Sequence, residues 1–150
     1  LIEALNDEDS RVRSSGAYAL GDIGESAQDA VTALTEGLHD ESEWVRRHAA
    51  EALGAIGQPM EETISGLIDL LRDEHHWVRD NATRALARMG TAAEAATPAL
   101  IPVLNDENRY VRFHAVLALK QIGTPEAEKI LFDHLFASRW CALTTQETPY

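Results

Sequence analysis

The sequence is poor in cysteine, in aromatic residues and in basic side chains. Its only cysteine, Cys141, cannot build a disulfide framework or a multi-thiolate zinc site. No hydrophobic run approaches the roughly 18 residues that a membrane-spanning helix needs, and no signal-peptide pattern opens the sequence. We therefore expect a reduced, soluble, cytoplasmic protein that does not bind membranes.

Acidic residues outnumber basic ones, with 25 Asp and Glu against 13 Lys and Arg and a net charge of −12. This sign opposes binding to nucleic acid or to an anionic membrane. The 150 residues, of which 45% are hydrophobic, are enough for one hydrophobic core. Alanine and leucine, both strong helix formers, dominate the composition. The composition predicts an all-α protein.

Six columns of identical residues recur every 33 residues along the chain. One column is the acidic set Asp7, Asp40, Asp73 and Asp106. A second is the arginine set Arg13, Arg46, Arg79 and Arg112, and a valine precedes each arginine. A glycine closes each unit at Gly24, Gly57, Gly90 and Gly123. Repeats of this length stack on their neighbours as a solenoid.

We predict one domain, a right-handed α-solenoid of about four and a half helix-turn-helix repeats. The predicted units are 1–24, 25–57, 58–90, 91–123 and 124–137, and residues 138–150 form a degenerate cap or tail. In each full unit the second helix ends at the glycine. The predicted second helices are 10–23, 43–56, 76–89 and 109–122. The predicted first helices are 27–38, 60–71 and 93–104.

Two irregular places carry further expectations. Pro98 and Pro102 lie inside the predicted helix 93–104 and should kink it. In the last unit, Trp140 and Cys141 take the position that Trp77 and Val78 hold in a full repeat. The arginine of the Val-Arg pair is replaced there by Ala142, which agrees with a degenerate cap or tail over 138–150.

The string D-x-x-x-x-V-R-x-x-A-x-x-A-L-G-x-I-G, matched almost throughout by residues 44–57, resembles the HEAT repeat. The form it resembles is the short repeat found in phycobilisome lyase subunits, and the resemblance covers residues 1 to about 137. It implies a helical solenoid whose second helices line a concave ligand-binding surface. It does not fix an activity, because one fold serves many functions.

The recurring aspartates and arginines are interpreted as a structural ladder rather than as acid–base pairs. Asp40 lies in the turn between the helices, and Arg46 lies in the first turn of the second helix. In a stack, each arginine can reach an aspartate of its own or of a neighbouring repeat, and the aspartate can also accept backbone N–H bonds. The HEAT resemblance implies the same ladder.

The face of the second helices opposite their apolar stripe is the candidate binding surface. It carries every aromatic residue before Phe132, and its charges nearly balance on an otherwise acidic chain. Aromatic residues and arginines are typical of protein-binding surfaces. The alternative, packing of the aromatics between repeats, stays open. The candidate binding residues are Arg11, Tyr18, Trp44, Arg47, His48, Trp77, Asn81, Arg84, Arg88, Tyr110, Phe113 and His114.

The sequence predicts no catalytic residue, metal site or cofactor. His48 and His114 share a column but are two repeats apart, and stacked helices lie about 10 Å apart, so the pair cannot share a metal. Deoxyhypusine hydroxylase, an enzyme of this fold, needs His-Glu pairs, and none is present.

The main functional hypothesis is a non-catalytic scaffold for a protein or peptide. The first alternative is a subunit resembling phycobilin lyase, because aromatics and arginines suit a planar tetrapyrrole with propionates. A remote alternative is a HEAT-like DNA glycosylase, suggested by Trp77, Asp80 and Arg84. The exposed terminal half-repeats also suggest self-association.

Overall fold

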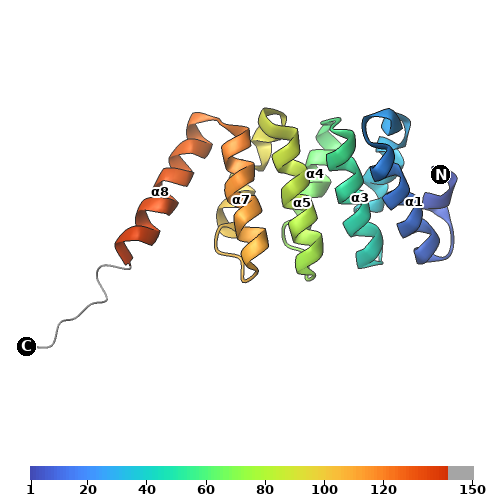
Figure 1. The fold of residues 1–150 in the computed structure, drawn as a ribbon, viewed down its shortest axis with the longest axis horizontal. Coiled ribbons are helices and arrows are strands. Elements are labelled where there is room, and N and C mark those ends of the chain that lie inside the picture. The colour runs from blue at the N-terminus through green and yellow to red at the C-terminus, as the bar shows by residue number, and fades with distance from the viewer. Residues whose placement is uncertain (142–150) are drawn as a thin grey trace, which may run out of the picture.

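The computed structural model describes residues 1–141, with side chains described as far as Ala137, and this part of the chain contains helices and turns but no strand. Four helices of fourteen residues each lie side by side in chain order (Figure 1). They are α1 (Ser10–Ile23), α3 (Glu43–Ile56), α5 (His76–Met89) and α7 (Arg109–Ile122). Their bounds match the predicted second helices at both ends.

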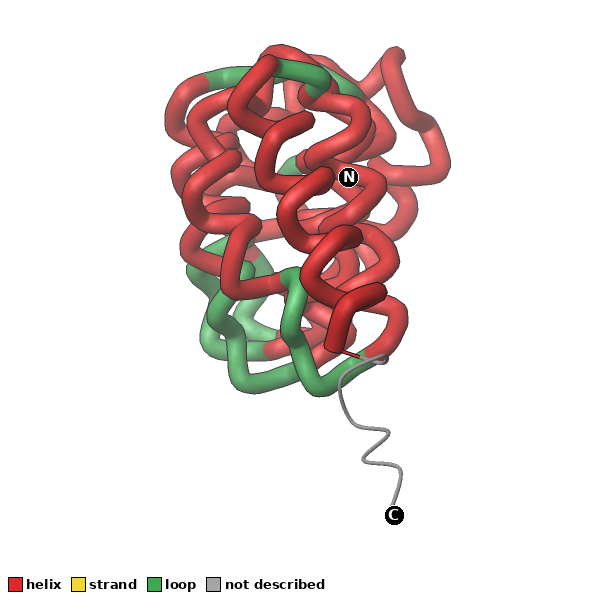
Figure 2. The backbone as a smooth tube through the Cα atoms, turned by 90° about the vertical axis from the view of Figure 1, so that its left-hand side faces the viewer, coloured by secondary structure: helices red, strands yellow, loops and turns green. Residues whose placement is uncertain are grey.

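The remaining helices form a second layer behind these four, except the last one, which lies beside α7 at the C-terminal end of the row (Figure 1). In chain order they are the 3-10 helix η1 (Glu3–Asn6), η2 (Gly24–Ala30), α2 (Val31–Gly37), α4 (Glu61–Leu70), η3 (Gly90–Ala96), α6 (Thr97–Val103) and α8 (Pro125–Cys141). Viewed from the end, the helices form two stacks, and the loops gather mostly along one edge (Figure 2). The predicted all-α solenoid of repeats is confirmed.

The first helices of two repeats are divided rather than continuous, which corrects the predicted spans 27–38 and 93–104. The α-helical part begins only at Val31 and Thr97, after the 3-10 helices η2 and η3. In η3 the buried residues are Ala93 and Ala96, three positions apart, and η2 has the same pattern. A spacing of three is the period of a 3-10 helix, so this turn buries both alanines on one side.

The division does not come from the prolines, contrary to the expected proline kink. The non-helical residue is Ala93 (φ −91°, ψ 23°), which precedes Pro98. Its counterpart Ala27 has the same conformation (φ −95°, ψ 30°) in a repeat without proline at that position. Pro98 lies in the first turn of α6, where a proline lacks no hydrogen bond, and Pro102 is accommodated within the helix.

The last repeat contains a single long helix. Helix α8 runs without interruption from Pro125 to Cys141, and no glycine or proline lies between these two residues. Residues 138–141 continue α8, and the part of the predicted cap or tail after Cys141 lies outside the described residues.

Small aliphatic residues fill the space between the layers, and no aromatic side chain among residues 1–137 is buried. Leu53, Leu86 and Leu119 are fully buried at equivalent positions of successive repeats. Gly54 lets α3 and α5 approach so closely that a Cβ added there would lie 2.8 Å from the Cα of Ala85. Gly57 ends α3 in the left-handed conformation (φ 71°), which favours glycine. In the described part of the chain, no helix has the length and hydropathy to span a membrane.

Candidate functional site

The ladder of aspartates and arginines joins each repeat to the next one. Arg46 donates from Nε to Oδ2 of Asp73 at 2.7 Å and from Nη2 to Oδ1 at 3.3 Å. Arg13 pairs with Asp40, and Arg79 with Asp106, each with an Nε–Oδ2 distance of 2.7 Å. The partner is always 27 residues ahead, so the aspartate belongs to the following repeat.

Each ladder group is fully engaged inside the protein. Nη1 of Arg46 donates to the carbonyl oxygens of Asp40 and Glu41, and Oδ1 of Asp73 accepts from the N–H of His75 at 2.9 Å. Burial of the Asp73 carboxyl raises its pKa, but these hydrogen bonds from Arg46 and His75 outweigh the burial and hold the pKa below its usual value. A carboxylate held in its ionised form by two partners is poorly suited to proton transfer.

The ladder stops at Arg112. Its Nη1 donates to the carbonyl oxygens of Asp106 and Glu107, as in the other repeats. No carboxylate among the described side chains accepts from this guanidinium. At the other end, the carboxylate of Asp7 accepts from the N–H of Asp9 and has no arginine partner within the described residues, although the carbonyl oxygen of Asp7 accepts from Nη1 of Arg13.

An aromatic strip crosses the surface of the four second helices. It consists of Tyr18, Trp44, Trp77, Tyr110 and Phe113, whose exposed fractions are 52%, 51%, 51%, 55% and 63%. At most half of each side chain is therefore used in packing. Two of the rings are paired with arginines, Cζ of Arg47 lying 5.8 Å from the Trp44 ring centre and Cζ of Arg109 lying 4.7 Å from that of Tyr110.

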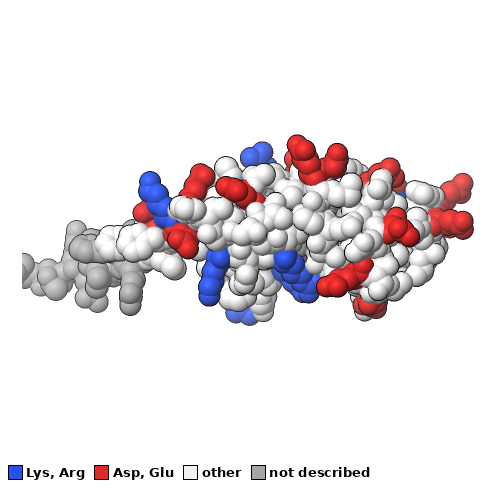
Figure 3. Space-filling view, turned by 90° about the horizontal axis from the view of Figure 1, so that it is seen from above, with Lys and Arg blue, Asp and Glu red and all other residues white. Residues whose placement is uncertain are grey.

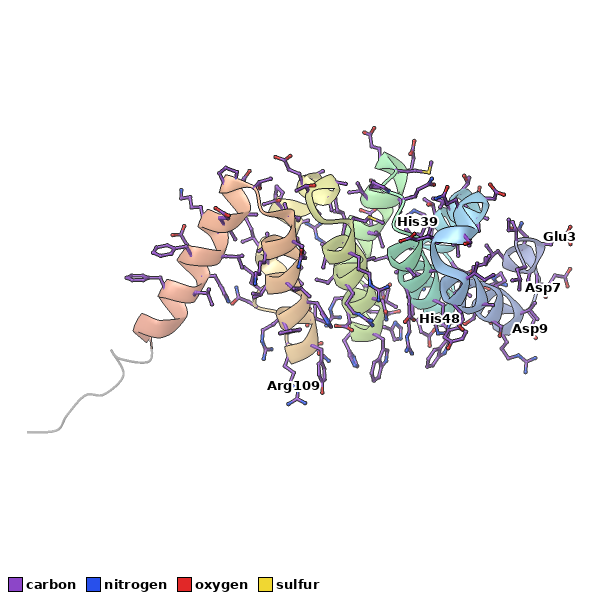
Figure 4. The ribbon with its side chains drawn as sticks, turned by 45° about the horizontal axis from the view of Figure 1, so that its top comes forward. Glu3, Asp7, Asp9, His39, His48 and Arg109 are labelled. Carbon is purple, nitrogen blue, oxygen red and sulfur yellow. The ribbon has the colours of Figure 1, made fainter. Side chains whose placement is uncertain are left out.

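The two candidate histidines make polar contacts between neighbouring second helices. Nδ1 of His48 lies 2.8 Å from Oγ of Ser14 on α1, and His48 occupies the side of α3 that faces α1 (Figure 4). Nδ1 of His114 lies 2.7 Å from Oδ1 of Asp80 on α5. Both contacts join residues 34 positions apart. Ser14 and Asp80 were not predicted from the sequence as the partners of these histidines. The alignment of the repeats could have suggested them, because both pairs have the same separation in sequence.

The junction between α3 and α5 lacks such a contact. The equivalent residues are Arg47 and Asn81, and Asn81 is almost fully buried, with its Nδ2 donating to the carbonyl oxygen of Trp77. Nε of Arg47 is buried and has no hydrogen-bond partner among the described residues. Asn81 thus holds the backbone beside Trp77 and offers little surface of its own to a ligand.

His48 is a weak base. Burial of the imidazole, followed by the positive charge of Arg47, lowers its pKa below the usual value. The ring of Tyr18 packs edge-on against it, with 5.5 Å between ring centres. His48 therefore lies under the aromatic strip as a neutral group at neutral pH.

Two of the hollows along the face of the second helices differ in charge. The hollow between α5 and α7 has a volume of about 270 Å³ and is lined by Arg84, Ala87, Arg88, His114, Leu117 and Gln121. The hollow over α1 and α3 has a volume of about 180 Å³ and is lined by Tyr18, Gly21, Asp22, His48, Glu51, Ala52, Ala55 and Arg88. Seen from above, basic groups lie along the edge of the second helices near the middle, whereas acidic groups dominate the opposite edge and the N-terminal end (Figure 3).

The structure brings most of the candidate binding residues onto one face but does not gather them into one pocket. Arg11 lies at the N-terminal edge, where its side chain is exposed and bonded to Asp9 through Nη2 at 2.6 Å. That bond lowers the pKa of Asp9 to about 2. Among the described residues no group of three His, Cys, Asp or Glu side chains could hold a metal ion.

Comparison with known proteins supports the repeat architecture. A family model described as HEAT repeats matches three overlapping stretches, residues 1–87, 31–105 and 64–140. A search of curated proteins finds no significant match. An engineered protein of the Northeast Structural Genomics Consortium is 27% identical, with a TM-score of 0.73 over 89% of this chain and 67% of its own.

Two further solved structures share the fold. A designed armadillo repeat protein in complex with the peptide (KR)4 is 22% identical, with a TM-score of 0.74 over 98% of this chain and 74% of its own. The complex of CpcE and CpcF of phycocyanin lyase from Nostoc sp. PCC7120 is 25% identical. Its TM-score is 0.69 over 90% of this chain and 62% of that chain.

Proposed function

The chain belongs to the HEAT-repeat family, and we propose that it is a non-catalytic scaffold that binds another protein or a peptide on the face of its second helices. The observation that carries this proposal is the aromatic strip. Exposed aromatic rings in one row are unfavourable in water and are typical of surfaces that a partner covers. The core is built without aromatics, so the strip is not an overflow from a crowded interior.

The arginines of this face support the same proposal. Arg47 and Arg109 lie against rings of the strip, where a guanidinium contributes both apolar contact and charge. Aromatic residues and arginine are the types that dominate binding energy at protein interfaces. The ladder pairs at the three repeat junctions are not part of the proposed surface, because their donors and acceptors already bind one another.

A comparison of variants tests the proposal. Wild-type protein, a Trp44→Ala/Trp77→Ala variant and a Glu36→Ala/Glu62→Ala variant are immobilised at equal density and exposed to the same lysate. A specific partner should be retained by the wild type and by the glutamate variant, whose changes lie on the outer helices, and lost from the tryptophan variant. Loss from the glutamate variant alone would place the working surface on the outer helices.

A second candidate function is a subunit resembling phycobilin lyase, which handles a tetrapyrrole on a phycobiliprotein. The structural similarity to the CpcE and CpcF complex favours it. The rings of the strip could stack on a planar chromophore, and the arginines could meet its propionates. Mixing the protein with a free bilin tests this candidate. A shift of the visible absorbance that Trp77→Ala abolishes would support it, and an unchanged spectrum would exclude bilin binding by this chain alone.

A further inference from the structure

The hollow between α5 and α7, here called the basic hollow, contains two arginines and no acid. Arg84 and Arg88 are four residues apart on α5 and therefore point from the same side of the helix. Like charges at this spacing repel each other. Leu117 and Ala87 supply apolar walls around them.

The two arginines of the basic hollow have no ion-pair partner among the described side chains. The side-chain hydrogen bond of Arg84 is long, at 3.4 Å from Nη1 to Oδ1 of Asn81. Asp80, one turn before Arg84 on α5, is bound instead to Nδ1 of His114 at 2.7 Å. Within this hollow the repulsion between the two arginines therefore has no counterion, although the neighbouring hollow, which Arg88 also lines, contains acidic groups.

The neighbouring hollow shows that this arrangement is specific to one end of the face. The hollow over α1 and α3 contains Asp22 and Glu51 beside Arg88. The face is thus acidic toward the N-terminus and basic over α5 and α7, on a chain whose net charge is −12. Two arginines without an acid among the other lining residues distinguish the basic hollow from its neighbour.

We propose that the basic hollow binds a carboxylate of the partner, supplied by an acidic side chain of a peptide segment that lies across the aromatic strip. This inference rests on the proposed function and adds the chemistry of the ligand. Guanidinium groups bind carboxylates with strong, directional hydrogen bonds. Arg88 lines both hollows. The acidic part of the peptide would therefore lie on the side of Arg88 toward α7, and a neutral or basic part would lie on the side toward α1.

Two synthetic peptides test the proposal, acetyl-GLEWELG-amide and the same peptide with both glutamates replaced by glutamine. NMR follows the Nε–Hε signals of Arg84 and Arg88 and the indole N–H signals of Trp44 and Trp77. The acidic peptide should shift the arginine signals and bind about tenfold more tightly than its glutamine counterpart, which is about 1.4 kcal/mol. Acetate at the same carboxylate concentration should produce a much smaller shift.

Matched variants identify the hollow as the source of the preference. Arg84→Gln and Arg88→Gln should each reduce the preference for the acidic peptide, whereas Arg72→Gln, which makes the same charge change outside this face, should keep it. If both peptides shift the indole signals equally and leave the arginine signals unchanged, the carboxylate site is wrong while the proposed binding face stands. If neither peptide shifts the indole signals, the proposed function loses support as well. Equal shifts from acetate and the acidic peptide would overturn a peptide ligand for the hollow.

Discussion

Arg79 on α5 and Asp106 in the inter-helix turn of the next repeat form a two-point ion pair, with distances of 2.7 Å from Nε to Oδ2 and 3.1 Å from Nη2 to Oδ1. The same guanidinium donates through Nη1 to the carbonyl oxygens of Asp73 and Glu74. One side chain therefore ties together the inter-helix turns of two consecutive repeats. About nine-tenths of both side chains is buried, so neither charge is well solvated without the other.

Replacing Arg79 with alanine should lower the free energy of unfolding by roughly 1–3 kcal/mol, because Asp106 would remain largely buried without its charged partner. Denaturant unfolding followed by circular dichroism measures the loss. Arg112→Ala is the matched control, since this arginine keeps the backbone contacts but has no carboxylate partner among the described residues. Equal losses in the two variants would show that the carbonyl contacts, rather than the ion pair, carry the stabilisation.

The ladder should make the protein sensitive to acid. For Asp40, Asp73 and Asp106, burial raises the pKa, but the hydrogen bonds from arginine and backbone prevail and the net pKa is lowered. Their stabilisation is complete above the unfolded value of about 3.9 and is lost as the pH falls through the lower folded values. Melting temperatures should therefore fall steeply below about pH 4.

Asp73→Asn provides the comparison for this acid effect. The variant should be less stable than the wild type at pH 7, and the two melting curves should converge as the pH falls below about 4, where the wild-type carboxyl also becomes neutral. Curves that stay parallel over the whole range would contradict the assignment of Asp73 to the acid response.

Gly54→Ala should destabilise the protein although alanine favours helix by about 1 kcal/mol over glycine. The added Cβ would lie 2.8 Å from Cα and 3.0 Å from Cβ of Ala85, so α3 and α5 would have to move apart. Such overpacking typically costs about 1–3 kcal/mol. Thermal unfolding measures the effect. Gly21→Ala is the milder control, because its Cβ would lie 3.2 Å from Cα of Ala52. A more stable Gly54→Ala protein would mean that the two helices separate easily.

Trp77→Ala should weaken binding of the partner at least about thirtyfold, since truncating a buried aromatic anchor typically costs about 2 kcal/mol or more. The fold should be retained, because half of this side chain is exposed and the core columns are untouched. Titration calorimetry with the captured partner gives the affinity, and Glu62→Ala serves as the control on α4. Unchanged affinity of the Trp77→Ala variant would mean that the aromatic strip packs between repeats and does not bind the partner.

The sequence was sufficient to locate the second helices because characteristic residues stand near the start and at the end of each helix. Each Val-Arg pair follows a turn, and glycines such as Gly57 stop the helix in a backbone conformation that other residues avoid. The exposure of the aromatic columns also followed from helical geometry, since Trp44 and Trp77 lie opposite the apolar stripe.

Other features depend on distances between repeats that a sequence does not contain. The alignment allowed Arg79 to pair within its own repeat or with a neighbour, and only the stacking geometry selects Asp106. The same holds for the contact between Asp80 and His114 and for the basic hollow, which needs the actual gap between α5 and α7. The division at Ala27 was missed because a 3-10 turn and an α-helix bury alanines at overlapping spacings.

The ladder pairs have the same separation in sequence at every repeat junction, and this affects how the chain folds. Its ion pairs span 27 residues, and the histidine contacts between second helices span 34, so the described long-range polar bonds stay within neighbouring repeats. Because these bonds join only adjacent repeats, their separation in sequence is set by the length of the repeat and does not grow with the length of the chain. No closure of the whole chain is required before the first interface forms, and each later repeat docks onto an existing one at a similar entropic cost.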